Sequence, residues 1–248
     1  SEKKNENGYK GRFREIAAVL HKHEISKGIT PEKLRLILED LGPTFVKVGQ
    51  LMSLRSDILP KNYCDELQKL CSDVPPMPFY EVEEVLRDSF GYEWQEEFEW
   101  IDETPLGSAS IAQVHRARLK TGEEVVIKVQ RKGIYEIMAR DIGLMHKLVS
   151  LVPPISITDM VDFKMVLNEL WKVTQEEMNF IIEARNMEEF KEKNRDVAFV
   201  DTPVLFKEYT TSSVIVMEYI DGYAIDDKEH LLEDGYDMNE IGSKYVDN

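Results

Sequence analysis

The chain has 248 residues, enough for one large domain or two small ones with a sizeable core. Its 31 Lys and Arg against 47 Asp and Glu give a formal net charge of −16, which repels nucleic-acid phosphates, so we expect no nucleic-acid partner. Hydrophobic residues make up 42% of the chain, too many for a disordered protein. We therefore expect a folded unit.

Apolar stretches and cysteines bear on the compartment. The stretch 148–157 is about half the ~20 residues that a spanning helix needs, and two prolines interrupt it. The first residues, SEKKNENG, lack the apolar core of a secretory signal. If their segment is helical, Cys64 and Cys71 lie roughly 10 Å apart along its axis, too far for a disulfide. We expect reduced thiols in a cytoplasmic protein.

Residues 12 to about 90 have the apolar spacing of helices. Thr30-Pro31-Glu32 carries three start signals, a capping Thr, a first-turn Pro and an acid near the positive helix end. Gly42-Pro43 then ends this helix and starts another. Consecutive prolines make 73–78 a linker, and 80–90 is predicted as a further amphipathic helix.

The helix that starts at Pro43 has two different faces. Phe45 and Met52 lie on the apolar face, where Gly49 would let a neighbouring helix approach closely. Lys47 and Gln50 lie on the opposite face, one turn apart. Taken alone, this polar pair is ordinary amphipathicity.

After residue 95 the pattern changes to strands. Segments 98–101, 110–119 and 123–130 favour strand, and Thr121-Gly122 makes the turn between the last two. These three segments predict a β-meander.

Helices and further strands follow the meander. A helix is predicted around 134–150, and 162–195 forms either one long helix or a broken pair. Segments 204–210 and 212–220 are predicted as two more strands. The residues after Asp221-Gly222 have a helical pattern.

Lys128 lies on a strand, 123–130, in which apolar residues predominate. It shares one face with Val126 and Gln130, so its side chain leaves the sheet in a defined direction. A cation in this place favours an anionic partner, and Glu183 in the later helical segment is the candidate. The alternative is an edge-strand lysine whose ammonium group reaches water.

A loop of small residues, LGSASIAQV at 106–114, precedes Lys128. Small side chains let backbone N–H groups come close to phosphate oxygens, whereas the plainer interpretation is a tight hairpin. The order of strand, small loop, strand, turn, strand with VVIKV, a helix with Glu, and then two strands ending VMEYIDG is that of a protein-kinase small lobe.

Six segments resemble the UbiB/AarF family of atypical kinases: KVGQ (47–50), SLRSDILP (53–60), LGSASIAQVHRA (106–117), VVIKVQRKGI (125–134), EEMNFIIEARNMEEF (176–190) and VMEYIDG (216–222). The resemblance implies an α+β fold. A helical extension with the KxGQ motif over 1–92 would precede a kinase-like small lobe, an antiparallel sheet with inserted helices, over 93–220. The hinge and the start of a truncated large lobe would occupy 221–248.

The resemblance also implies roles for individual residues. Lys128 would hold the α- and β-phosphates with Glu183 as its ion-pair partner, and Lys47 and Gln50 match the KxGQ motif of the catalytic site. The cofactor-binding positions would be Gly107, Ser108, Ala109 and Ser110 in the loop, Lys128, Met217 as gatekeeper, and Glu218 and Ile220 in the hinge. Glu177 is the possible metal ligand, and Asn179 stands where the family's second acid is expected.

The family implies ATP or ADP as ligand, Mg²⁺ in the full-length protein, and a partner related to quinone biosynthesis or lipids. It also implies peripheral membrane association through later segments. A catalytic-loop acid and a DFG-type Asp do not follow the hinge before Asn248, so we expect the front part of a longer kinase or ATPase, inactive alone. The alternative is a non-catalytic ATP-sensing or scaffold module, while the strand-rich middle argues against a purely helical adaptor.

We also expect Lys47 to contact an acid of the 162–195 segment or the small-residue loop. On one continuous helix, Glu176, Asn179 and Glu183 would lie at i, i+3 and i+7 and would form such a surface, with Glu177 adjacent. The alternative is a solvated polar stripe with Lys47 exposed.

Overall fold

The computed structural model describes residues 2–70, 74–151 and 163–247. The first helices are α1 (Glu2–Lys22), η1 (Ile25–Lys27), α2 (Pro31–Leu41), α3 (Pro43–Met52), α4 (Lys61–Leu67) and α5 (Phe79–Phe90). The middle of the chain contains η2 (Trp94–Glu96), β1 (Phe98–Ile101), β2 (Gly107–Ser108), β3 (Ala112–Leu119), β4 (Glu124–Gln130) and α6 (Ile134–Leu151). The last elements are α7 (Phe163–Glu177), α8 (Phe180–Lys193), η3 (Lys207–Tyr209), β5 (Val214–Glu218), α9 (Lys228–Glu233) and α10 (Met238–Asp247).

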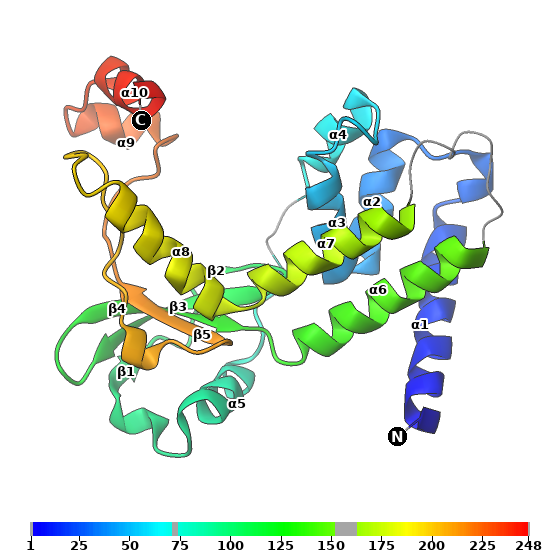
Figure 1. Ribbon diagram of the computed structural model, residues 1–248, viewed down its shortest axis with the longest axis horizontal. Coiled ribbons are helices and arrows are strands. Elements are labelled where there is room, and N and C mark those ends of the chain that lie inside the picture. Colours follow the sequence, from blue (N-terminus) through cyan, green and yellow to red (C-terminus); the bar gives the residue numbers. More distant parts are fainter. Residues whose placement is uncertain (1, 71–73, 152–162, 248) are drawn as a thin grey trace.

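These elements form a sheet with helices on both faces and a helical part beside it (Figure 1). In the view of Figure 1, α5 lies below the sheet and α8 above it, while α6 and α7 extend away from the sheet toward α1, α2 and α3. The helix α1 and the last helix, α10, lie at opposite ends of the molecule.

The predicted helix boundaries around α2 and α3 are confirmed. The Thr30 hydroxyl accepts a hydrogen bond from the Lys33 N–H at 3.2 Å and caps α2. Gly42, with φ of 94°, ends α2 in a conformation that glycine adopts without strain, and Pro43 begins α3.

Gly49 allows the close helix approach that its position predicts. A Cβ atom at this residue would lie 2.5 Å from Leu70 Cδ1 and 2.7 Å from Leu38 Cδ1. No larger side chain fits there unless these leucines move, so α3 is seated directly against α2 and the residues after α4.

A five-stranded antiparallel sheet forms the centre of the second part. Its order is β1-β3-β4-β5, and the short β2, which the sequence pattern did not predict as a strand, pairs with β3. In this register Val114, Lys128 and Ile215 are neighbours, so their side chains share one face of the sheet. The opposite face packs against α5 in an apolar core whose fully buried members include Leu86, Val125, Ile127, Val129 and Val216.

The prediction of a strand over 204–210 is wrong. Only Leu205 forms a bridge, opposite Met217, and the chain then turns into η3. Phe206 and Tyr209 both pack against the apolar core on the α5 side of the sheet. Side chains three residues apart share a face in a turn but not in an extended strand, which explains why the strand stops.

The segment 162–195 is a broken pair of helices, so the continuous i, i+3, i+7 surface of Glu176, Asn179 and Glu183 is also wrong. The Asn179 side chain accepts a hydrogen bond from the Ile181 N–H at 3.2 Å and caps α8. Phe180 is fully buried, and its N–H donates to the Ser212 carbonyl at 3.1 Å. The break lets Phe180 enter the core beneath Lys128.

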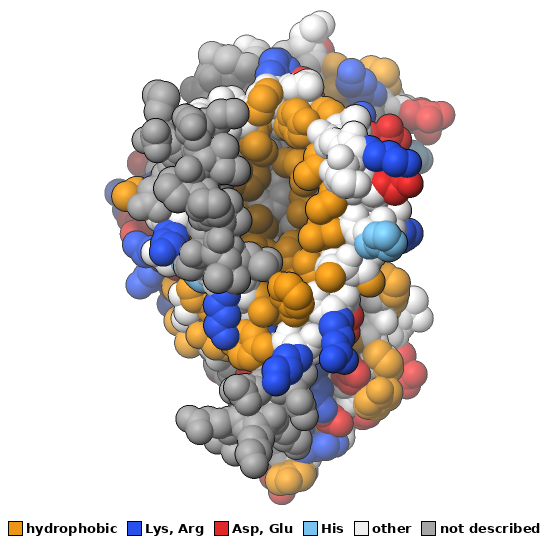
Figure 2. Space-filling view, turned by 90° about the vertical axis from the view of Figure 1, so that its right-hand side faces the viewer, with side chains coloured by type: hydrophobic (Ala, Val, Ile, Leu, Met, Phe, Trp, Pro, Cys, Tyr) orange, Lys and Arg blue, Asp and Glu red, His pale blue; other side chains and the backbone are white. Residues whose placement is uncertain are grey.

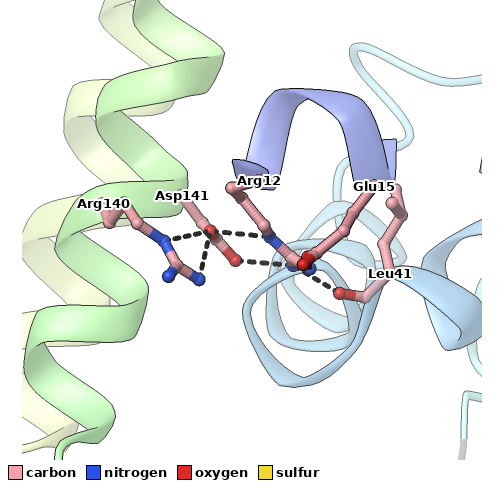
Figure 3. A network of polar contacts seen from close by, with 5 residues as sticks. All are labelled: Arg12, Glu15, Leu41, Arg140 and Asp141. Carbon is pink, nitrogen blue, oxygen red and sulfur yellow. Dashed lines mark hydrogen bonds and ion pairs between the residues drawn. The ribbon is translucent and has the colours of Figure 1, made fainter. Parts of the chain in front are cut away.

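A buried polar network joins α1 to α6 and to the end of α2 (Figure 3). The Arg12 guanidinium donates to both carboxylate oxygens of Asp141 at 3.0 and 2.8 Å, and to the Leu41 carbonyl at 2.6 Å. Asp141 is fully buried and also accepts hydrogen bonds from Arg140 at 3.3 Å. Because α3 begins directly after Leu41 and Gly42, this network fixes where α3 enters the fold.

Hydrophobic side chains gather along a hollow on the face that Figure 1 has at its right (Figure 2). Among residues 2–70, 74–151 and 163–247, no helix is both long and apolar enough to cross a membrane. Cys64 is a buried free thiol in α4, whereas Cys71 lies outside the described residues.

Candidate functional site

A cavity of about 1000 Å³ lies where the Lys128 face of the sheet, α3 and the α7–α8 junction meet. The sequence-predicted residues that line it are Lys47, Gln50, Gly107, Ser108, Ala109, Ser110, Lys128, Glu177 and Glu183. These residues come from segments up to about 140 positions apart in the chain, and the fold brings them to one cavity.

Lys128 and Glu183 form an ion pair at this cavity. The Lys128 Nζ donates to the two carboxylate oxygens of Glu183 at 2.8 and 2.7 Å, which confirms the predicted contact. The Lys128 Nζ also lies 4.9 Å from the centre of the Phe180 ring, where a cation is attracted by the π electrons. The ammonium group is therefore held by α8 instead of extending into water.

Lys47 forms an ion pair with Glu177, which is the last residue of α7. Only 17% of the Lys47 side chain is exposed, so the solvated polar stripe is ruled out and the predicted contact with an acid of this segment is confirmed. The Gln50 amide lies one turn further along α3 and donates to the Leu70 carbonyl at 3.3 Å. Together these contacts place the polar face of α3 against the cavity.

The small-residue loop turns tightly between β2 and β3. The Ala109 N–H donates to the Ala112 carbonyl at 2.8 Å, and the loop backbone from Gly107 to Ser110 lines the cavity. The interpretation of the sequence missed Arg131, whose side chain donates to the Ala109 carbonyl at 2.7 Å. The only signal was its position directly after strand 123–130, which does not indicate what it contacts.

The predicted gatekeeper and hinge residues are not among the residues that line this cavity. Met217 pairs with Val126 on the Lys128 face of the sheet and packs beside Phe180. The Glu218 carboxylate accepts a hydrogen bond from the Val204 N–H at 3.0 Å, and Ile220 is 58% exposed. The cavity thus collects the lysines and the small loop, while Met217 packs against Phe180 and Ala112, which line the cavity, without lining it itself.

The residues present do not make a metal site by themselves. Within the described part of the chain, no group of three or more His, Cys, Asp or Glu is arranged to hold a metal ion. The Glu177 carboxylate is paired with Lys47, and the Asn179 amide oxygen caps α8. No step that depends on Mg²⁺ can therefore be assigned to these residues alone.

An antiparallel sheet with a strand lysine paired to a helical glutamate, beside a small-residue loop, defines a protein-kinase-like small lobe. Comparison with known families agrees with this class. Residues 69–248 match the ABC1 atypical kinase-like domain, and the chain belongs to this family.

Relatives of this chain carry kinase names. A Pseudomonas fluorescens protein named probable protein kinase UbiB is 35% identical over 228 residues, which cover 90% of this chain and 42% of that protein. The chloroplastic protein ACTIVITY OF BC1 COMPLEX KINASE 8 of Arabidopsis thaliana is 35% identical over 242 residues, or 96% of this chain and 31% of that protein. An uncharacterized Clostridium pasteurianum protein from the hydrogenase 1 5′ region is 43% identical over 87% of this chain and 41% of its own length. The chain therefore spans less than half the length of these relatives.

A solved structure supports the fold. The Rv3197 protein of Mycobacterium tuberculosis, solved in complex with erythromycin, aligns with a TM-score of 0.53 and 30% sequence identity. The alignment covers 76% of this chain and 48% of Rv3197.

Proposed function

We propose that the cavity binds an adenine nucleotide, ATP or ADP, with its phosphates toward Lys128 and the small-residue loop. The chain is then the nucleotide-binding portion of a UbiB-like atypical kinase or ATPase. The observation that carries this proposal is the Lys128–Glu183 ion pair at 2.7 Å, at the wall of a cavity that the loop also lines.

The chemistry of the cavity wall suits such a ligand. The Lys128 ammonium group has three N–H donors. The two carboxylate oxygens of Glu183 accept two of them, so the third is available to a phosphate oxygen. Apolar side chains of Ile111, Val114 and Met187 line the same cavity and offer a surface for the base or ribose. A volume of about 1000 Å³ is sufficient for a nucleotide.

The Lys47–Glu177 ion pair lies in the wall of this cavity, where it would restrict the space that a protein substrate needs. This favours a small or membrane-embedded substrate, and the resemblance to the UbiB/AarF family implies a role in isoprenoid-quinone biosynthesis or lipid homeostasis. In this proposal the partner is related to quinone biosynthesis or lipids, the protein associates peripherally with a membrane, and Mg²⁺ binds in the full-length protein.

A second candidate is a non-catalytic ATP-sensing or scaffold module that acts on the same kind of partner. The observation that favours it is the engagement of Glu177 by Lys47, which removes the one carboxylate that the family pattern offers for a metal in this chain. Nucleotide binding is common to both candidates, and ATP turnover by a longer chain distinguishes them.

Isothermal titration of ADP and ATP into wild-type protein and Lys128→Met tests the nucleotide site. We expect Lys128→Met to weaken binding by about tenfold or more, because a charge-assisted hydrogen bond to phosphate is lost. Lys120→Met, a change at an exposed lysine beyond β3, is the matched control and should bind like wild type. Unchanged affinity in Lys128→Met would return this lysine to a structural role, and absence of binding in the wild type would refute the proposal.

A further inference from the structure

We propose that Arg131 is a positioning residue for phosphate binding, which holds the small-residue loop in shape and places a positive charge behind it. This inference rests on the proposed nucleotide function and deepens it, since it names a determinant of phosphate recognition outside the cavity lining. Arg131 follows directly after β4, the strand that carries Lys128.

Arg131 holds the loop at three points. Its Nε donates to the Ala109 carbonyl at 2.7 Å, and its Nη2 donates to the Ser108 hydroxyl at 2.6 Å. Its backbone N–H donates to the Ile111 carbonyl at 2.7 Å. The planar guanidinium has donors in fixed directions, so these bonds restrict the loop more than a lysine ammonium would.

The same side chain also reaches the linker between α4 and α5. The Arg131 Nη2 donates to the Pro75 carbonyl at 2.8 Å, and the Val74 N–H donates to the Ser108 carbonyl at 3.2 Å. The loop, the linker and the end of β4 therefore meet at one guanidinium. A change in Arg131 would release the loop from the linker as well as from the sheet.

The charge of Arg131 is not neutralised by a carboxylate in contact with it. The ion pairs within the described ranges do not include Arg131, and the acceptors of its side chain are two carbonyls and a hydroxyl. Burial lowers the pKa of this guanidinium below its usual value, but an arginine stays protonated at neutral pH. Arg131 is half-buried, its hydrogen-bond acceptors are neutral, and the Glu81 carboxylate, which makes no ion pair with it, acts on it through charge alone. A further anion near the guanidinium would add to this stabilisation.

The orientation of the loop favours a phosphate group on its cavity side. Carbonyl oxygens repel phosphate oxygens, and those of Ala109 and Ile111 are directed to Arg131. The loop residues Gly107 to Ser110 meanwhile line the cavity. Arg131 therefore acts through the loop, and its effect should be confined to ligands that carry phosphates.

The test compares ADP with adenosine, which lacks the phosphates, by isothermal titration. We expect Arg131→Met to weaken ADP binding about 10- to 100-fold, the range for loss of hydrogen bonds to a charged group, and to change adenosine binding less than twofold. Arg131→Lys keeps the charge and loses the fork, so an intermediate loss is expected. Arg118→Met, which removes an arginine that donates to the Gly122 carbonyl in the β3–β4 turn, should bind both ligands like wild type.

Hydrogen exchange of residues 106–112 provides a readout that needs no ligand. Both Arg131 variants should exchange faster than wild type over this loop. In Arg118→Met, the exchange rate of residues 106–112 should equal that of wild type. Unchanged ADP affinity in Arg131→Met, or an equal loss for ADP and adenosine, would overturn the inference while leaving the nucleotide site in place. If the wild type binds neither ligand, the proposed function and the phosphate role of Arg131 both fail, and unchanged loop exchange would refute its positioning role as well.

Discussion

Lys47 shows at the scale of single residues how a polar face becomes part of a site. Its ammonium pairs with Glu177, and only 17% of the side chain is exposed. The pair neutralises the carboxylate that the family pattern offers to a metal. If Glu177 is a metal ligand, as the family resemblance implies, this ion pair competes with the metal for its carboxylate.

Lys47→Met should therefore make nucleotide binding more dependent on Mg²⁺. With Lys47 removed, the Glu177 carboxylate would be released from its ion pair and would be able to hold Mg²⁺ that accompanies the nucleotide. We expect the ratio of ADP affinities with and without MgCl₂ to rise at least threefold above that of wild type, as measured by titration. Lys69→Met, which removes an exposed lysine paired with Glu66 at 2.6 Å, is the matched control. An unchanged ratio in Lys47→Met would show that Glu177 takes no part in metal binding.

His115 is a buried residue whose protonation state is fixed by its neighbours. Its Nδ1 lies 2.7 Å from the Asp102 carbonyl, which can only accept, so Nδ1 carries the hydrogen. Its Nε2 lies 2.8 Å from the Gln113 Nε2, which donates to it. The Gln113 amide oxygen accepts from the Met77 N–H at 2.8 Å, which sets the amide orientation. Burial lowers the pKa of His115, so the neutral ring is the folded form.

Acidification should therefore destabilise the protein through His115. Above the unfolded pKa of about 6.5 both states are neutral, and below it the unfolded chain binds a proton that the folded chain does not. The free energy of unfolding should fall between pH 7.5 and 5.5 by up to about 1 kcal/mol more in wild type than in His115→Gln, measured by urea unfolding. His21→Gln, at an exposed position in α1, should keep the wild-type pH dependence. Identical curves for wild type and His115→Gln would contradict this assignment.

At the scale of elements, the Arg12–Asp141 network determines how the N-terminal helices are attached. The Arg12 guanidinium bonds α6 through Asp141 and the end of α2 through the Leu41 carbonyl, and it lies 5.6 Å from the centre of the Phe45 ring of α3. Apolar contacts of Ile16 and Leu144 in the same region join α1 and α6. The apolar contacts hold α1 against α6, and the directional bonds of Arg12 fix the orientation of α3.

Arg12→Ala should destabilise the fold strongly, because it leaves the buried Asp141 carboxylate with only Arg140 at 3.3 Å. We expect a loss of about 3–5 kcal/mol in the free energy of unfolding, measured by urea denaturation. Arg14→Ala, at an exposed position one half-turn away, should change stability by less than about 0.5 kcal/mol. Arg12→Met combined with Asp141→Leu should recover most of the loss, and failure to recover would indicate that the ion pair itself is required.

The elements also show what the sequence can predict. Alternating apolar residues around Lys128 predicted β4, and the Thr30 and Gly42 signals predicted the ends of α2, because these patterns are local. The 204–210 strand was wrong and the break at Asn179 stayed undecided, because both depend on which side chains the sheet buries, Phe206 in one case and Phe180 in the other. The contacts of Arg131 likewise depend on tertiary structure. Local patterns and the family resemblance predicted the elements of the site and the contacts of Lys128 and Lys47 with acids, while the contacts of Arg131 came from packing.

At the scale of the whole molecule, the residues that could contact a ligand are distributed unevenly along the chain. The cavity holds two lysines, the small loop and a paired Glu177, whereas the region after β5 contributes none of its lining residues. Phosphoryl transfer needs acids that hold Mg²⁺ and a group that orients the nucleophile. The sequence after Asp221 contains neither a DFG-type motif nor a catalytic-loop pattern. If the cavity binds a nucleotide as proposed, binding and turnover are separable in residues 1–248.

Residues 1–248 should bind nucleotide and not hydrolyse it. Purified protein is incubated with ATP and MgCl₂, and phosphate release is followed by ³¹P NMR, with Lys128→Met prepared in parallel to reveal any contaminating ATPase. We expect the two samples to release phosphate at the same background rate, because the groups that would hold the metal are absent from the sequence and Glu177 is paired with Lys47. Metal-dependent turnover in the wild type that Lys128→Met lacks would contradict this prediction.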